Sequence, residues 1–256
     1  MSLDLAFLES GEGAPIVVLH GLFGSARNWN MIARRLAVHR RVLALDLRNH
    51  GNSPWADAMD YPAMADDVRH FIESRELGRC TVLGHSMGGK AAMWLALQRP
   101  DLVDALIVAD IAPVSYDGSL LDYVHVMKAV DLGRFRRRAE VEDALADTIA
   151  EPGIRSFLMQ NLVAEGGSLR WRLNLDAIEK DFGAISGFPA TDLHYEGPTL
   201  FLNGERSDYI RPDNERDIRD LFPAARIETI PGAGHWLHAE QPDAVFEAIS
   251  RFLNLG

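Results

Sequence analysis

A chain of 256 residues with 26 Lys and Arg against 37 Asp and Glu carries a formal net charge of −11, which argues against a nucleic-acid partner because such a partner requires a basic face. This length suits one α/β domain with an insertion, and the single cysteine excludes an intrachain disulfide. No apolar stretch approaches the length of a membrane span, and acidic residues interrupt the apolar N-terminal run. We therefore expect a cytoplasmic protein without stable membrane insertion; its oligomeric state stays open.

Short apolar runs alternate with helix-length segments along the chain. Residues 3–9 are expected to form an antiparallel edge strand that turns at residues 11–13. Strands are predicted over 15–20, 41–46, 80–85, 105–110, 198–203 and 226–230, and helices over 28–38, 64–77, 91–98, 214–221 and 244–253. Apolar runs without polar alternation are typical of strands buried on both faces. The sequence thus predicts an α/β fold with a mostly parallel central sheet and helices on both faces.

A long gap separates the apolar run that ends at Asp110 from the run that starts at Pro198. A structureless loop of that length is implausible, and apolar residues in the gap recur at helical spacing. Two such helix faces comprise Leu120, Val124, Met127 and Val130, and Ile154, Phe157, Leu158 and Leu162. We interpret residues 114–195 as a helical cap inserted after the sixth core strand, over the C-terminal edge of the sheet. Residues 1–113 and 196–256 then form the core domain.

The motif Gly84-His85-Ser86-Met87-Gly88 lies between a predicted strand and a predicted helix. A strand, a sharp turn with one serine and a helix are typical of a nucleophile elbow. The small glycines allow the chain to wrap around a strained backbone at the serine. A five-residue pattern also occurs by chance, as a plain structural turn, but this context predicts Ser86 as a catalytic nucleophile.

A serine nucleophile needs a general base and a carboxylate that orients it. His235 follows the last predicted strand and a short glycine-containing loop, where this architecture places the base; a surface-loop histidine is the alternative. Asp110 and Asp208 each follow a predicted strand, and both give the order Ser, Asp, His, so order does not decide between them. The other histidines near these motifs are expected to be hydrogen-bonding scaffolds: His20, His50, His85 and His238.

An oxyanion needs two backbone donors. We expect one to be the N–H of Met87 and the other to come from the glycine-rich turn at residues 20–24, with Leu22 favoured over Phe23. The side chains of Leu22, Phe23, Met87 and Trp236 are expected to shape a mainly hydrophobic substrate pocket with the cap.

Other patterns carry less information. Arg134 and the arginines at positions 136–138 are typical of a solvated helix face. The alternative is that they bind an anionic group such as a CoA phosphate. The spacing of histidines and cysteines does not suggest a metal site.

The chain resembles the α/β-hydrolase superfamily over nearly its whole length, and within it the YbfF-type bacterial esterases and thioesterases, which are related to ABHD11-type hydrolases. The matching stretches are HGLFGS at 20–25, DLRNHGNSP at 46–54, YPAMADDV at 61–68, GHSMGGKAAM at 84–93, DIAPV at 110–114 and GAGHWLHAEQPDAV at 232–245. The resemblance implies a serine hydrolase of ester or thioester bonds, with short acyl esters and acyl-CoA among its substrates and no cofactor. It also implies Asp110 as the triad acid, whereas Asp208 restores an acid at the position common in the superfamily and stays the alternative.

Two other function classes remain open at this stage. The same fold and triad occur in lyases and cofactor-free oxygenases, and a hydrolase-like receptor with slow turnover would also keep the motifs. The prediction is a serine hydrolase that forms an acyl-enzyme with a small-molecule acyl ester or thioester.

Overall fold

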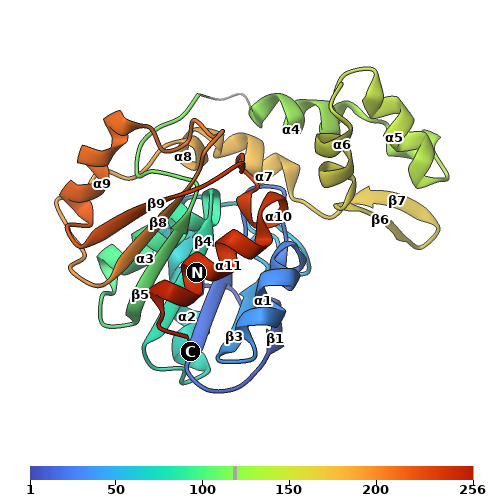
Figure 1. Ribbon diagram of the computed structural model, residues 1–256. Helices are drawn as coiled ribbons and strands as arrows, with labels where there is room; N and C mark the ends of the chain where they lie inside the picture. The colour runs from blue at the N-terminus through green and yellow to red at the C-terminus, as the bar shows by residue number, and fades with distance from the viewer. Residues whose placement is uncertain (118–119, 256) are drawn as a thin grey trace.

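The computed structural model describes residues 1–117 and 120–255 (Figure 1). In these residues a seven-stranded sheet has the order β1-β3-β2-β4-β5-β8-β9, with β1 antiparallel to β3 and the remaining pairs parallel. Its strands are β1 (Phe7–Ser10), β2 (Pro15–Leu19), β3 (Arg41–Leu45), β4 (Cys80–His85), β5 (Val103–Ala109), β8 (Thr199–Gly204) and β9 (Ala225–Ile230). The predicted α/β fold and mostly parallel sheet are confirmed. The turn at residues 11–13 does not close a hairpin, because β3 lies between β1 and β2.

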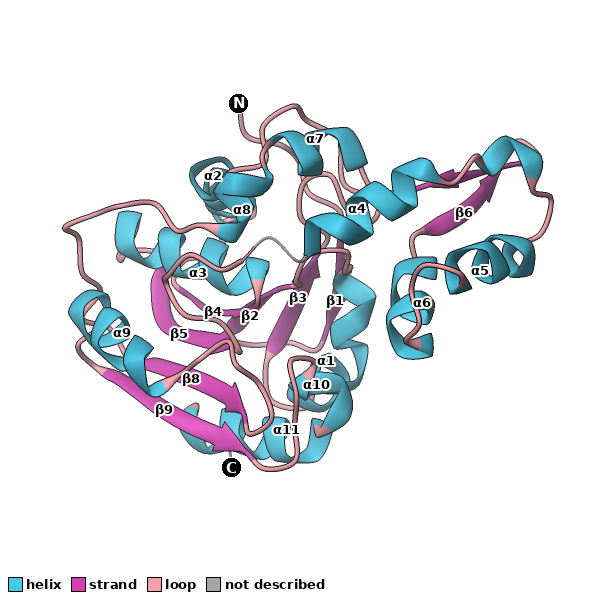
Figure 2. Ribbon diagram, turned by 90° about the horizontal axis from the view of Figure 1, so that it is seen from above, coloured by secondary structure: helices cyan, strands magenta, loops and turns pink. Residues whose placement is uncertain are grey.

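The two faces of the sheet carry separate apolar layers. Ile16 and Val18 of β2 point into one layer, and Val17 and Leu19 point into the other, because successive side chains of a strand alternate between faces. Helices α1 (Asn30–Leu36) and α11 (Pro242–Phe252) cover the first face. The second face is covered by α2 (Tyr61–Ser74), α3 (Met87–Gln98) and α9 (Glu215–Leu221). Figure 2 shows the helices on both sides of the sheet.

Helix α2 begins three residues before the predicted start. The carboxylate of Asp60 caps the helix by accepting a hydrogen bond from the Ala63 N–H at 2.8 Å, and Pro62 occupies the first turn. Both residues favour a helix start, and both precede the apolar residues from which the helix was predicted. Shorter helices are η1 (Ala26–Trp29), η3 (Pro212–Asn214) and α10 (Leu237–Glu240). Among the helices of the described residues, none is both long and apolar enough to cross a membrane.

A buried ion pair holds the loop after β3 against α2. Arg48 contacts both carboxylate oxygens of Asp67, Nε at 2.7 Å and one terminal nitrogen at 2.8 Å. Both side chains are almost fully buried. The same guanidinium donates to the carbonyls of Ala58 and Ala63, each at 3.0 Å. Each of the three guanidinium nitrogens therefore has at least one acceptor.

The segment between β5 and β8 rises above the sheet and extends to the upper right of Figure 1. It follows the fifth strand of the chain rather than the sixth. Its helices are α4 (Leu120–Ala129), η2 (Leu132–Arg134), α5 (Arg138–Ala146), α6 (Pro152–Met159), α7 (Leu175–Lys180) and α8 (Phe182–Ser186). The boundary of the cap at residues 114–195 stays a prediction.

The cap is not purely helical, which corrects the expectation for Leu162. This residue begins β6 (Leu162–Glu165), which pairs antiparallel with β7 (Ser168–Trp171). Gly166 and Gly167 join the strands with φ of 58° and 80°. A two-residue hairpin turn needs positive φ at both positions, so the Gly-Gly pair was the signal for this hairpin.

The single cysteine lies in the sheet interior. Cys80 is a free thiol at the start of β4 and is fully buried. Burial raises the pKa of this thiol to about 12.

Candidate active site

Ser86 occupies a sharp turn between the end of β4 and the start of α3. Its φ of 51° and ψ of −120° lie in a region that non-glycine residues rarely adopt. A Cβ on Gly84 would lie 2.1 Å from the carbonyl oxygen of Gly88, and a Cβ on Gly88 would lie 2.5 Å from that of His20. Glycine is therefore required at both positions, and the predicted strand, turn and helix are present.

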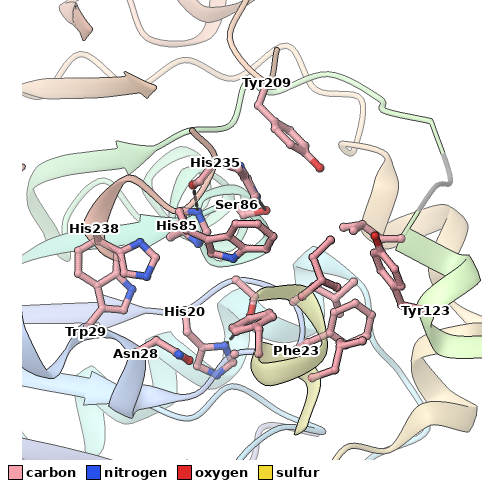
Figure 3. Close-up of a pocket in the computed structure, with 18 residues that line it drawn as sticks. His20, Phe23, Asn28, Trp29, His85, Ser86, Tyr123, Tyr209, His235 and His238 are labelled. Carbon is pink, nitrogen blue, oxygen red and sulfur yellow. Dashed lines mark hydrogen bonds between the residues drawn. The ribbon is translucent and has the colours of Figure 1, made fainter. Parts of the chain in front are cut away.

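His235, in the loop after β9, faces Ser86 and Asp110 with its two ring nitrogens. Nε2 of His235 lies 3.1 Å from Oγ of Ser86, and Nδ1 lies 2.8 Å from Oδ2 of Asp110 (Figure 3 shows His235 beside Ser86). Asp110 is fully buried, and its Oδ1 accepts a hydrogen bond from the Gly204 N–H at 2.8 Å. A carboxylate that accepts from Nδ1–H leaves the lone pair of Nε2 directed at the serine hydroxyl.

The structure brings Asp110 to His235 and leaves Asp208 apart. Asp208 is exposed, and within the described residues no hydrogen bond or ion pair joins it to His235. The preceding residue, Ser207, donates its hydroxyl hydrogen to Oδ2 of Asp110. Sequence reasoning missed Ser207, because a serine beside an aspartate in a loop has no local signature. Its location after β8, where the superfamily commonly has an acid, was the available signal.

Two further side chains hold His235 in place. The buried His85 lies with Nε2 2.8 Å from the carbonyl oxygen of His235, and the Tyr209 ring stacks on the His235 ring with centroids 4.0 Å apart. Burial is the main cause that lowers the pKa of His85 well below its usual value, and the nearby rings of His235 and His238 lower it further. His85 is thus a neutral donor to the backbone of His235, consistent with its predicted scaffold role.

The turn at residues 20–24 lies beside the elbow and presents backbone N–H groups. The N–H of Phe23 donates to Nε2 of His50 at 3.2 Å. Burial lowers the pKa of His50 to about 3, and its Nδ1 lies 2.9 Å from the carbonyl oxygen of Arg48, so the single ring proton is on Nδ1 and Nε2 is an acceptor. The Leu22 N–H has no protein acceptor within the described residues. Met87 is the first residue of α3, where a helix leaves its N–H groups free.

A cavity of about 160 Å³ opens beside Ser86 and His235 (Figure 3). Of the four side chains expected to shape the pocket, Leu22, Phe23 and Trp236 line this cavity, whereas Met87 lines a smaller neighbouring cavity. The cap contributes Leu120, Tyr123, Ile154, Phe157 and Leu158. The cavity is therefore mainly hydrophobic. Arg134 and residues 136–138 are exposed on the cap and do not line it.

The α/β hydrolase fold family model matches residues 14–242. The mouse sn-1-specific diacylglycerol lipase ABHD11 is 44% identical over 99% of this chain and 85% of its own length. Esterase YbfF of Escherichia coli K12 is 38% identical over 95% of this chain and 94% of its own. A solved marine microorganism esterase superposes with a TM-score of 0.96 at 42% identity, over 98% of this chain and all of its own.

The chain belongs to the α/β-hydrolase fold family. The resemblance to the YbfF and ABHD11 relatives is thereby confirmed. Within the family, the chain is a carboxylesterase-type hydrolase, since these relatives and the marine structure are named esterases or a lipase.

Proposed function

We propose that this α/β hydrolase cleaves carboxylic esters through an acyl-enzyme on Ser86, with His235 as general base and Asp110 as the orienting acid. The observation that carries the proposal is the chain of contacts from Ser86 Oγ to His235 Nε2 at 3.1 Å and from His235 Nδ1 to Asp110 at 2.8 Å. This geometry lies within the reach that proton transfer needs.

In the first half-reaction, Oγ of Ser86 attacks the ester carbonyl carbon while Nε2 of His235 takes the hydroxyl proton. The carbonyl oxygen becomes an oxyanion, which the N–H groups of Leu22 and Met87 stabilise. The tetrahedral intermediate then loses its alcohol, which takes the proton from His235 as the carbon–oxygen bond breaks. Buried Asp110 stabilises the transient imidazolium.

In the second half-reaction, water attacks the acyl-enzyme as His235 takes one of its protons. The bond between the carbonyl carbon and Oγ breaks, Ser86 recovers the proton from His235, and a carboxylic acid leaves. Every step uses groups of the chain itself, without a cofactor. The same steps apply to thioesters, and acyl-CoA is the proposed finer substrate class beside short acyl esters.

The first experiment compares wild type with Ser86→Ala on a chain-length series of p-nitrophenyl esters and acyl-CoAs. We expect turnover of the esters by wild type and its loss, by at least about 10³-fold in kcat, in the variant. Activity that persists in Ser86→Ala would exclude Ser86 as the nucleophile. Wild-type inactivity on every substrate would favour a lyase, an oxygenase or a slow-turnover receptor.

A further inference from the structure

Two cavities meet at Ser86. The large lobe is the cavity of about 160 Å³ described above, and the small lobe, of about 40 Å³, is lined by Met87, Ile111 and Phe182 among others. Leu22, Ser86, Leu120 and Tyr209 line both lobes, so the nucleophile lies at their junction. An ester bound at Ser86 therefore has two directions in which to extend.

The position of the general base distinguishes the two directions. His235 lines the large lobe and is absent from the lining of the small lobe. In the tetrahedral intermediate the leaving oxygen must accept a proton from Nε2 of His235, at a distance of about 2.6–3.2 Å. The leaving group therefore extends into the large lobe. The oxyanion points to the backbone N–H groups of Leu22 and Met87 at the wall of the small lobe, and the acyl substituent takes the remaining direction from the same carbon, into the interior of that lobe.

The two lobes differ strongly in capacity. One water-sized group needs about 10–15 Å³ of cavity volume. The small lobe therefore accepts roughly three such groups and the large lobe at least about ten. An acyl chain of more than about four carbons would exceed the small lobe. The large lobe, with apolar walls from the cap, matches a long hydrocarbon chain.

The basic side chain in the small lobe is already bonded. Nζ of Lys90 donates to the carbonyl oxygens of Val114, Ser186 and Gly187 at 2.8, 2.9 and 2.6 Å, so every N–H bond of the protonated group has an acceptor. The lobe also includes the acidic Asp117. An acyl group with a terminal carboxylate would find no donor at Lys90, so the lobe suits a neutral acyl group.

We propose that the enzyme selects short, neutral acyl groups esterified to long apolar alcohols, with the acyl group in the small lobe and the alcohol in the large lobe. This proposal rests on the proposed ester hydrolysis at Ser86. It predicts a limit on the length of the acyl group and a separate preference for a long chain in the alcohol.

Two isomeric esters test the assignment, because octyl acetate and ethyl octanoate contain the same atoms and differ in which side of the bond is long. We expect kcat/KM for octyl acetate to exceed that for ethyl octanoate by at least about tenfold. The octyl chain can be buried in the large lobe, whereas most methylenes of the octanoyl chain do not fit in the small lobe and lose the free energy of burial. A preference for ethyl octanoate, or equal rates, would overturn the assignment. Ser86→Ala must abolish turnover of the preferred isomer.

The same substitution in each lobe provides a matched pair. Phe182→Ala enlarges the small lobe and should raise kcat/KM for ethyl octanoate about tenfold. Phe157→Ala removes a wall of the large lobe and should lower kcat/KM for octyl acetate severalfold without raising that for ethyl octanoate. The ratio of the two isomers is measured on each variant, so a loss of folded enzyme cancels. An unchanged ratio in Phe182→Ala would contradict the placement of the acyl group.

Failure of the proposed function has a different signature. Neither isomer nor p-nitrophenyl acetate would then be turned over by wild type, or their turnover would survive in Ser86→Ala. An inverted isomer preference with turnover that depends on Ser86 would overturn the lobe assignment alone.

Discussion

Oδ2 of Asp110 lies 2.8 Å from Nδ1 of His235 at the buried end of the site. The same oxygen accepts the hydroxyl of Ser207, and the other carboxylate oxygen accepts the Gly204 N–H at 2.8 Å. These donors fix the plane of the carboxylate and, through it, the plane of the imidazole. The orientation of His235 therefore depends on β5, which ends just before Asp110, and on the loop after β8.

Exchange of each candidate acid for asparagine tests this relationship. In Asp110→Asn the side chain can present an amide to Nδ1 of His235, which favours the wrong tautomer. We expect kcat for p-nitrophenyl acetate to fall about 10³- to 10⁴-fold. Asp208→Asn, in an exposed position, is the control and should stay within about threefold of wild type. A larger loss in Asp208→Asn than in Asp110→Asn would show that the acid is Asp208.

The buried pair between Arg48 and Asp67 predicts a large effect on stability. Asp67→Ala leaves an unpaired guanidinium in the interior, which typically costs about 3–5 kcal/mol of unfolding free energy. Asp66→Ala removes a partner of Arg69 on the exposed side of the same helix and should cost less than about 1 kcal/mol. Urea unfolding of both variants measures the difference. Equal losses would mean that the buried pair contributes no more than a surface pair.

Lys90 predicts a pH dependence of stability. Burial lowers its pKa from 10.5 to about 7. Between these values the unfolded chain holds a proton that the folded chain has released. Lys90 therefore makes the free energy of unfolding rise with pH, by at most about 1.4 kcal/mol per pH unit. Below pH 7 both states are protonated and this dependence disappears.

The comparison with Lys90→Met isolates this contribution. Other groups titrate alike in both proteins, so the stability of wild type minus that of the variant should increase between pH 7 and pH 10. Urea unfolding at intervals of one pH unit gives the difference. A constant difference across this range would show that Lys90 keeps the same protonation in the folded and unfolded chains.

Two cap glycines predict opposite effects of alanine. Gly166 has a φ of 58° in the hairpin turn, so Gly166→Ala should destabilise the protein by about 1 kcal/mol or more. Gly153 lies in α6 with open space around the position of a Cβ, so Gly153→Ala should stabilise it by up to about 1 kcal/mol. Urea unfolding of each variant measures both effects. Destabilisation by Gly153→Ala would contradict the helical assignment of that turn.

Most of the core could be predicted because its signals are local. The apolar run at residues 80–85 matches β4, and the glycines around Ser86 correctly predict the sharp turn at that residue. The cap was harder to predict. The spacing of its apolar residues from Ile154 to Leu162 fits a single helix, although Leu162 begins a strand. There the Gly-Gly turn outweighs the apolar periodicity.

The choice of acid required the three-dimensional structure. Asp110 and Asp208 have the same order relative to Ser86 and His235, and what separates them is burial and distance. The role of Ser207 also depends on a contact between residues 97 positions apart. The expected cytoplasmic location stays a prediction.

The buried thiol of Cys80 gives the protein a built-in reporter of unfolding. It is the one cysteine of the sequence, and thiol reagents attack the thiolate, which a pKa of about 12 makes scarce in the native sheet. A chromogenic disulfide, in an excess that makes labelling faster than reclosing, will therefore label the enzyme at the rate at which strand β4 becomes exposed. A single absorbance trace can then follow the opening of the strand that carries Ser86, without any engineered probe.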